Sequence, residues 1–238
     1  MRILVVNDDG INAPGIEALA RAAIQFGEVW VVAPARQCSG MSQHLTILEE
    51  MELKAVDFPL PVADAWSLDG TPADCVKLGL ELLPGRPDYV FSGVNNGWNC
   101  GYDIAYSGTV GACCEAVLNG VPAIAFSAPY EEGFALASAH MPAIIAELLK
   151  RGQGAGEIWN VNFPGGDPEK LRTVLWDRRI AQTQLYKGFY SARADETGRQ
   201  MYSQTVELIG RELTGEDSDT AAVLDGYISV GKLKNYLI

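Results

Sequence analysis

An apolar run near the start of the chain ends abruptly in polar residues, and this change constrains the fold more than any other feature. Residues Ile3–Val6 are all apolar, which is typical of a strand buried on both faces of a parallel sheet. Asn7, Asp8, Asp9 and Gly10 follow directly. In open α/β sheets the ligand crevice lies just beyond the carboxyl ends of the strands. The pattern therefore predicts that both carboxylates lie at such a crevice.

The two adjacent carboxylates can serve one site only if the chain is already turning. Neighbouring side chains of a strand point to opposite faces, and Gly10 makes a turn easy. Two carboxylates about 4 Å apart repel by roughly 4 kcal/mol at an effective dielectric near 20. A hard divalent cation removes that cost and prefers oxygen ligands. These residues alone leave two interpretations open: a cation site, or a polar turn in which one Asp caps the next helix.

Composition excludes several classes of protein. The 238 residues are 48% hydrophobic, enough for a large α/β core, and no apolar run is long enough to span a membrane. An odd number of cysteines, five, and the absence of a basic-then-apolar leader predict a cytoplasmic protein without a disulfide framework or a membrane partner. The net charge of −12 argues against a nucleic-acid polymer as partner. This negative charge is still compatible with the binding of one small phosphate ester.

Strands and helices alternate along most of the chain. Helical spacing predicts helices over residues 12–26, 72–83, 110–119 and 134–150, and apolar runs predict strands over 29–33, 88–92, 123–127 and 158–163. Residues 45–69 have the pattern of shorter, more exposed strands. This alternation predicts an α/β fold: a Rossmann-like, mostly parallel sheet with right-handed crossovers and helices on both faces.

The pattern changes near residue 178, which suggests two parts of one unit. We expect residues 1–178 to form the α/β catalytic core. Residues 179–238 are expected to form an extended β-hairpin arm, over about 183–207, and a C-terminal segment. Such an arm either closes over a site or is exchanged between subunits, and we expect it to serve oligomerisation.

Several common chemistries are poorly supported. Neither a phosphate-binding Gly-x-x-x-x-Gly-Lys loop nor a Gly-x-Gly-x-x-Gly turn occurs after the first strand. With two histidines and no Cys-x-x-Cys pair, a zinc site is not expected, and no Gly-x-Ser-x-Gly elbow supports a serine triad. His140 falls in the middle of a helix, whereas His44 follows the loop of Ser39 and is a candidate for a position near the substrate.

Oxygen and amide groups instead follow the strands. Asp8 and Asp9 follow the first strand, Ser39 the second, and Asn95 and Asn96 the third. Their oxygens suit magnesium, manganese or calcium better than soft metals. Residues 107–109 then open a helix, where free N–H groups and hydroxyls can bind a phosphate. An N-cap with packing glycines is the alternative interpretation of that last motif.

These motifs together resemble the SurE survival-protein family of nucleotidases. The resemblance rests on six motifs in order, over about residues 1–127, and on a closing strand near 226–230; the motifs lie at residues 7–10, 13–15, 32–40, 69–76, 92–95 and 106–112. It implies a divalent-metal-dependent phosphomonoesterase that hydrolyses nucleoside 5′- and 3′-monophosphates, with short polyphosphate as a further substrate. It also implies homodimers or homotetramers built through C-terminal arms.

The resemblance assigns roles to particular residues. The metal ligands fall on Asp8, Asp9, Ser39 and Asn95, and the phosphate-contacting loop falls on Ser107, Gly108 and Thr109. One divalent cation per subunit is expected, Mg²⁺ or Mn²⁺, with Ca²⁺ as a non-activating occupant. Asp8 and Asp9 are also the catalytic candidates, since one of them can receive the proton of the attacking water.

Two departures from the family pattern affect substrate preference. Asn96 replaces the basic residue usual after the metal-binding Asn, and His44 stands where a small hydroxyl residue is common.

Two other functions stay open. Asp8 could act as a nucleophile that forms an aspartyl phosphate, although such enzymes place their second acid two residues on. The chain could also be a nucleotide-binding module without turnover.

Overall fold

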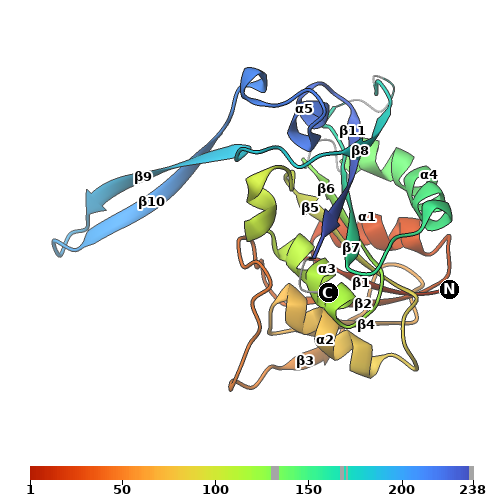
Figure 1. Ribbon diagram of the computed structural model, residues 1–238. Coiled ribbons are helices and arrows are strands. Elements are labelled where there is room, and N and C mark those ends of the chain that lie inside the picture. The colour runs from red at the N-terminus through yellow and green to blue at the C-terminus, as the bar shows by residue number, and fades with distance from the viewer. Residues whose placement is uncertain (130–133, 167–168, 170, 236–238) are drawn as a thin grey trace.

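A nine-stranded sheet forms the centre of the molecule (Figure 1). The computed structural model describes residues 1–129, 134–166, 169 and 171–235. The strand order is β3-β4-β2-β1-β5-β6-β7-β11-β8. The strands are β1 (Arg2–Val6), β2 (Glu28–Pro34), β3 (Leu53–Ala55), β4 (Asp64–Leu68), β5 (Tyr89–Asn96), β6 (Ala123–Ala128), β7 (Glu157–Asn162), β8 (Val174–Arg178) and β11 (Ile228–Lys234).

The sheet is parallel except at two of its pairings. Strand β3 runs antiparallel to β4, and β11 runs antiparallel to β7. From β1 the chain adds β2 and β4 on one side and later adds β5, β6 and β7 on the other. The strand order therefore reverses between β1 and β5, which is the position where open α/β sheets form their ligand crevice.

Helices cover both faces of the sheet. Helices α1 (Pro14–Ala23) and α4 (Ala135–Arg151) pack with Ile3 and Val5 of β1, whereas α2 (Pro72–Leu82) and α3 (Gly108–Leu118) belong to the core that contains Leu4 and Val6. Alternate side chains of one strand thus enter two separate cores, as a period of two residues requires. The predicted Rossmann-like α/β class is confirmed.

The third parallel strand is longer than predicted. We expected a strand over 88–92 and a loop over 93–109, but β5 continues to Asn96 and the segment Tyr102–Tyr106 is a 3-10 helix, η1. The pairing of β5 with β6 shifts in register between Ser92 and Asn95 and then resumes. An irregularity of this kind redirects side chains at the end of a strand. Here it lies directly before Asn95.

Three further elements were missed or misjudged. Strand β4, expected to be exposed, pairs in parallel with β2 and has three buried residues, because it extends the sheet instead of covering it. Strand β8 and helix α5 (Asp219–Leu224) were not predicted. Both are short, and short elements give little periodicity to recognise. No helix within the described part of the chain is long and apolar enough to cross a membrane.

A two-stranded hairpin projects from the body of the molecule (Figure 1). Strands β9 (Tyr186–Ala194) and β10 (Gln200–Leu208) pair antiparallel and are exposed along nearly their whole length. The predicted hairpin arm is confirmed. The rest of the segment 179–238 does not extend with it, since β11 enters the central sheet between β7 and β8. Residues 236–238 lie outside the described part of the chain.

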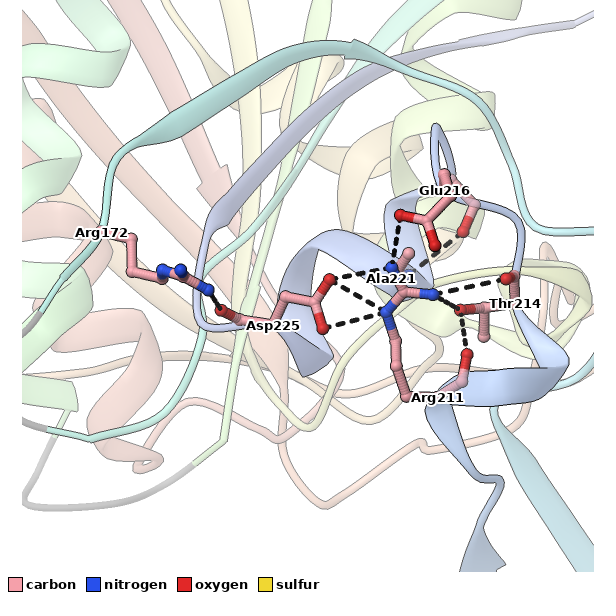
Figure 2. A network of polar contacts seen from close by, with 7 residues as sticks. Arg172, Arg211, Thr214, Glu216, Ala221 and Asp225 are labelled. Atoms are coloured by element: carbon pink, nitrogen blue, oxygen red, sulfur yellow. Dashed lines mark hydrogen bonds and ion pairs between the residues drawn. The ribbon is translucent and has the colours of Figure 1, made fainter.

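The C-terminal end of the hairpin is tied down by a single arginine. Figure 2 shows the Arg211 guanidinium between Asp225 and Glu216. Its Nε lies 2.9 Å from both carboxylate oxygens of Asp225, and its Nη2 lies 2.9 Å from Glu216. Nη1 donates to the Thr214 hydroxyl at 3.0 Å. The 3-10 helix η4 (Arg211–Leu213) is thereby held against the end of α5.

Side chains of the first turn cap the start of helix α2. The Thr71 hydroxyl accepts a hydrogen bond from the Asp74 N–H at 3.2 Å, and the Asp74 carboxylate accepts one from the Thr71 N–H at 2.9 Å. Pro72 occupies the first turn, where its missing N–H costs nothing. Asp74 also accepts from the Thr46 hydroxyl at 2.7 Å. The cap therefore joins the helix to the preceding loop.

Replacement of Thr71 by Ala should lower the free energy of unfolding by about 1 kcal/mol, the usual effect of losing an N-cap side chain. The matched control is Thr71→Ser, which keeps the hydroxyl and should retain most of the stability. Urea unfolding followed by circular dichroism measures both. Equal losses in the two variants would show that the hydroxyl contributes nothing.

Candidate active site

Asp8 and Asp9 turn toward different neighbours directly after β1. Asp8 is only 2% exposed, and its Oδ1 accepts a hydrogen bond of 2.6 Å from the Thr109 hydroxyl. Asp9 is half-buried, and its Oδ2 accepts from the Asn96 N–H at 2.9 Å. The Asn7 side chain bonds both the N–H and the carbonyl of Gly10, which has a φ of +101°. A tight turn therefore supports the two acids, as expected.

The loop after β2 reaches the same place. The Cys38 N–H donates to the Asp8 carbonyl at 2.7 Å, which fixes the loop against the first turn. The Gln37 amide donates to the Ser39 hydroxyl at 3.1 Å and lies 3.5 Å from Asp9 Oδ1, at the limit of hydrogen bonding. Ser39 is thus linked through one side chain to the carboxylate of Asp9. Gln37 was not singled out in the sequence, and its position two residues before Ser39 was the only signal.

Asn95 enters the site from the end of β5. Its side-chain N–H donates to the Gly97 carbonyl at 2.7 Å, so the amide group has a defined orientation. The side-chain oxygen is then the group that can bind a cation. Asn96, the next residue, is exposed and supplies its backbone N–H to Asp9.

The start of α3 uses its polar groups mainly to hold Asp8 and the helix. Ser107 is the N-cap, and its hydroxyl accepts from the Val110 N–H at 3.1 Å. Thr109 is fully buried and donates its hydroxyl to Asp8. A Cβ at Gly108 would lie 2.9 Å from that of Asp8, so only glycine allows this approach. The hydroxyl and the N–H of Thr109 are therefore engaged with Asp8, and the Val110 N–H is engaged with Ser107. The Gly108 N–H is the donor of this turn that suits a phosphate.

One cavity joins most of these groups. Its volume is about 780 Å³, and its lining includes Asp8, Ser39, Asn95, Asn96 and Ser107. Loops from three parallel strands and one helix start therefore open into one space. His44 lies elsewhere: it is exposed and lines a second hollow of about 470 Å³ together with Arg36 and Cys38.

The hairpin forms the far wall of the main cavity. The sequence did not indicate this, because Tyr186, Tyr190 and Gln204 lie about 90 to 110 residues after Asn95. Trp98 and Asp103 line the cavity between the two regions. Alternation of polar and apolar residues predicts a strand, but it does not predict which distant loop the strand will face.

Within the described part of the chain, no cationic side chain forms an ion pair with the carboxylates of the site. The pKa of Asp8 is raised to about 6, mainly by burial; the charge of Asp9 contributes to the rise, while the Thr109 hydrogen bonds oppose it. Burial likewise raises the pKa of Asp9. None of the ion pairs among the described residues involves either acid. Ionising a buried carboxylate next to a half-buried one is unfavourable when no cation is near, and a bound cation offsets that cost.

The donor set fits a hard divalent cation. Within the described residues no group of three or more His, Cys, Asp or Glu side chains is placed to hold a metal, so a site built only from such residues is not present there. Asp8 instead lines the same cavity as the neutral side chains of Ser39 and Asn95; Asp9 is not among the lining residues and is linked to Ser39 through Gln37. Oxygen-only donors of this kind suit Mg²⁺, Mn²⁺ or Ca²⁺ and not a thiolate-binding metal.

The fold is that of the doubly wound α/β proteins, which bind ligands at the switch point of the sheet, and acidic, amide and hydroxyl groups gather there in this chain. The chain belongs to the family described as Survival protein SurE, whose family model matches residues 3–185.

Relatives of known name match almost the whole chain. A 5′-nucleotidase SurE from Pelotomaculum thermopropionicum is 39% identical over 234 residues, covering 97% of this chain and 88% of that protein. A 5′-nucleotidase SurE from Brucella abortus is 41% identical over 245 residues, covering 98% and 92%. The crystal structure of the SurE protein from Aquifex aeolicus superposes with a TM-score of 0.83 at 37% identity, covering 98% of this chain and 93% of that one.

The burial of Asp8 predicts a pH-dependent stability for the metal-free protein. Because the pKa is about 6 when folded and 3.8 ordinarily, the folded state binds the proton more tightly, and stability falls as the pH rises between these values. The difference corresponds to roughly 3 kcal/mol. In urea unfolding with chelator, the parent protein should lose stability when the pH is raised from 4 to 7, and Asp8→Asn should lose much less over the same change. Asp57→Asn, an exposed control, should behave as the parent does; the same pH dependence in all three proteins would contradict the prediction.

Proposed function

We propose that the protein is a divalent-metal-dependent phosphomonoesterase that hydrolyses nucleoside 5′-monophosphates to nucleoside and phosphate. Two findings support this. The chain belongs to the SurE family, and its relatives from Pelotomaculum thermopropionicum and Brucella abortus are named 5′-nucleotidases. The single observation that carries the proposal is the 780 Å³ cavity, in which Asp8, Ser39 and Asn95 face Ser107 at the start of a helix.

In this proposal the residues have distinct tasks. Asp8 and Asp9 hold the cation, with Ser39 and Asn95 as neutral ligands. A bound Mg²⁺ or Mn²⁺ supplies charge neutralisation of the phosphoryl group and a water of lowered pKa. The Gly108 N–H at the start of α3 orients the phosphate, helped by the positive end of the helix dipole. The Thr109 hydroxyl keeps the Asp8 carboxylate in one orientation. Asp9, the less buried acid, receives the proton of the attacking water.

The proposal extends to substrates and location. Nucleoside 3′-monophosphates and short polyphosphate are included, since the same cation and helix start engage any terminal phosphoryl group. Asn96 stands where the family usually has a basic residue. Without that positive charge, we expect a weaker preference for multiply charged substrates over singly phosphorylated ones. A cytoplasmic location is supported by five free cysteines, of which four are buried.

Phosphate release from adenosine 5′-monophosphate in Mn²⁺ or Mg²⁺ tests the proposal. Activity should disappear in chelator and return with metal. Asp8→Asn and Asp9→Asn should each lower kcat/KM by at least about 100-fold, because loss of even an outer partner of a metal ligand costs 10- to 100-fold. Asp57→Asn is the surface control and should keep full activity.

The same assay separates the alternatives. Full activity in chelator would contradict the role of the cation. A phosphorylated Asp8 trapped by acid quench would show that Asp8 is a nucleophile. Saturable nucleotide binding without phosphate release in any divalent metal would show a binding module.

We further propose that the hairpin joins subunits into a homodimer or homotetramer. Its strands expose large apolar side chains, among them Met201, Tyr202 and Leu208. A long exposed strand pair is a template for association with another chain. Contact between such arms of neighbouring copies covers both the apolar surface and the strand edges.

Light scattering should give the mass of two or four chains for the intact protein. Replacement of residues 192–202 by a two-residue Asn-Gly turn removes the outer part of the hairpin and should lower that mass. A single-chain mass for the intact protein would contradict the proposal, as would an unchanged oligomer after the deletion.

A further inference from the structure

One face of the hairpin belongs to the main cavity. The hairpin residues that line the cavity are Tyr186, Gly188, Tyr190, Gln204 and Val206. All have even numbers, and the pairing register places Gly188 opposite Val206 and Tyr190 opposite Gln204. Alternate residues of a strand share a face, and directly paired residues share it too. The cavity is therefore bounded by a continuous surface of the hairpin and not by scattered contacts.

The Gln204 side chain lies over Gly188 on this face. Gly188 has no side chain, and a Cβ there would overlap the amide nitrogen of Gln204. Tyr190, which is 72% exposed, lies two residues further along the same strand, and Val206 pairs directly with Gly188. An aromatic ring, an amide and an apolar side chain therefore lie together on this face, and a larger residue at position 188 would displace the Gln204 amide.

The hairpin is held in a defined position relative to the cation site. The Asp103 carboxylate accepts hydrogen bonds from the N–H groups of Leu185 and Tyr186 at 2.7 and 2.8 Å. The Trp98 N–H donates to the Tyr186 hydroxyl at 3.1 Å, three residues after Asn95. The Arg211 contacts in Figure 2 hold the chain just after β10. Because Leu208 pairs with Tyr186, both sets of contacts lie at the base of the hairpin, which is therefore fixed against the body of the protein.

We propose that the face of the hairpin formed by Gly188, Tyr190, Gln204 and Val206 is a nucleobase subsite in the same chain as the cation site. The inference rests on the proposed nucleotidase function and names the part of the substrate that this wall recognises.

The chemistry of these side chains matches a nucleobase. A tyrosine ring can stack on any nucleobase, because every base has a flat aromatic face. The Gln204 amide offers both a donor and an acceptor to the edge of a base, and Val206 adds apolar contact. A phosphoryl group alone would need only the end with Asp8 and Ser107, whereas the cavity of about 780 Å³ continues to the hairpin.

The test compares a substrate that has a base with one that lacks it. For Tyr190→Ala and for Gly188→Val, kcat/KM is measured in Mn²⁺ with adenosine 5′-monophosphate and with ribose 5-phosphate. The ratio of the two values should fall about tenfold or more in both variants, in line with the loss of one stacking contact. Phe189→Ala is the matched control, since Phe189 is the neighbouring aromatic residue on the opposite face and does not line the cavity. Its ratio should equal that of the parent.

Two results would overturn the inference. The first is a ratio within twofold of the parent in Tyr190→Ala and Gly188→Val. The second is an equal loss with both substrates together with a lower mass in light scattering, which would show that this face contacts another subunit instead of the base.

Equilibrium binding of adenosine keeps the two proposals distinguishable. If the parent protein releases phosphate from neither substrate, the nucleotidase proposal fails. Adenosine binding then decides the subsite by itself: an affinity at least about tenfold lower in Tyr190→Ala than in Phe189→Ala supports it. Equal affinities in these two variants overturn it.

Discussion

The hydrogen bond from the Thr109 hydroxyl to Asp8 joins the end of β1 to the start of α3, and the geometry of the site depends on it. It holds a buried carboxylate in one orientation and brings Gly108 against the Asp8 side chain. The helix start is thereby placed at the switch point of the sheet, between β1 and β5, where the strand order reverses. A buried acid needs such a donor, because desolvation otherwise favours its neutral form. The same bond thus supports both the cation site and the phosphate end of the cavity.

Around this bond, oxygens from three crossovers meet at one edge of the sheet. Asp9 connects them: its carboxylate accepts from the Asn96 N–H on one side and lies near the Gln37 amide, which bonds Ser39, on the other. The sheet itself fixes the distances between these loops, since neighbouring parallel strands end side by side. The hairpin adds the opposite wall, and Asp103 and Arg211 both hold its base. The base of that wall is therefore tied to the body that carries Asp8 and Asp9.

Much of this arrangement is readable from local patterns. The run Ile3–Val6 predicts a buried strand because both faces of a parallel strand meet apolar cores. The cap of α2 follows from Thr71 and Asp74, whose hydrogen bonds are formed within three residues. The strand β5 was predicted to end four residues too early, because Gly93 and Asn95 have low strand propensity and sheet pairing overrides it. The role of Gln37 and the position of His44 also depend on how loops fold back.

Local patterns in the sequence predict the α/β class, the three polar strand ends, the polar helix start and the resemblance to the SurE family, since periodicity, turn residues and short motifs are local properties. The tertiary structure alone shows that the Thr109 hydroxyl binds Asp8, that β11 enters the central sheet, and that Tyr190 and Gln204 face the cavity. These contacts join residues at least about 50 positions apart. Packing of the whole chain selects such contacts, and no local pattern encodes which distant surface a strand or side chain will meet.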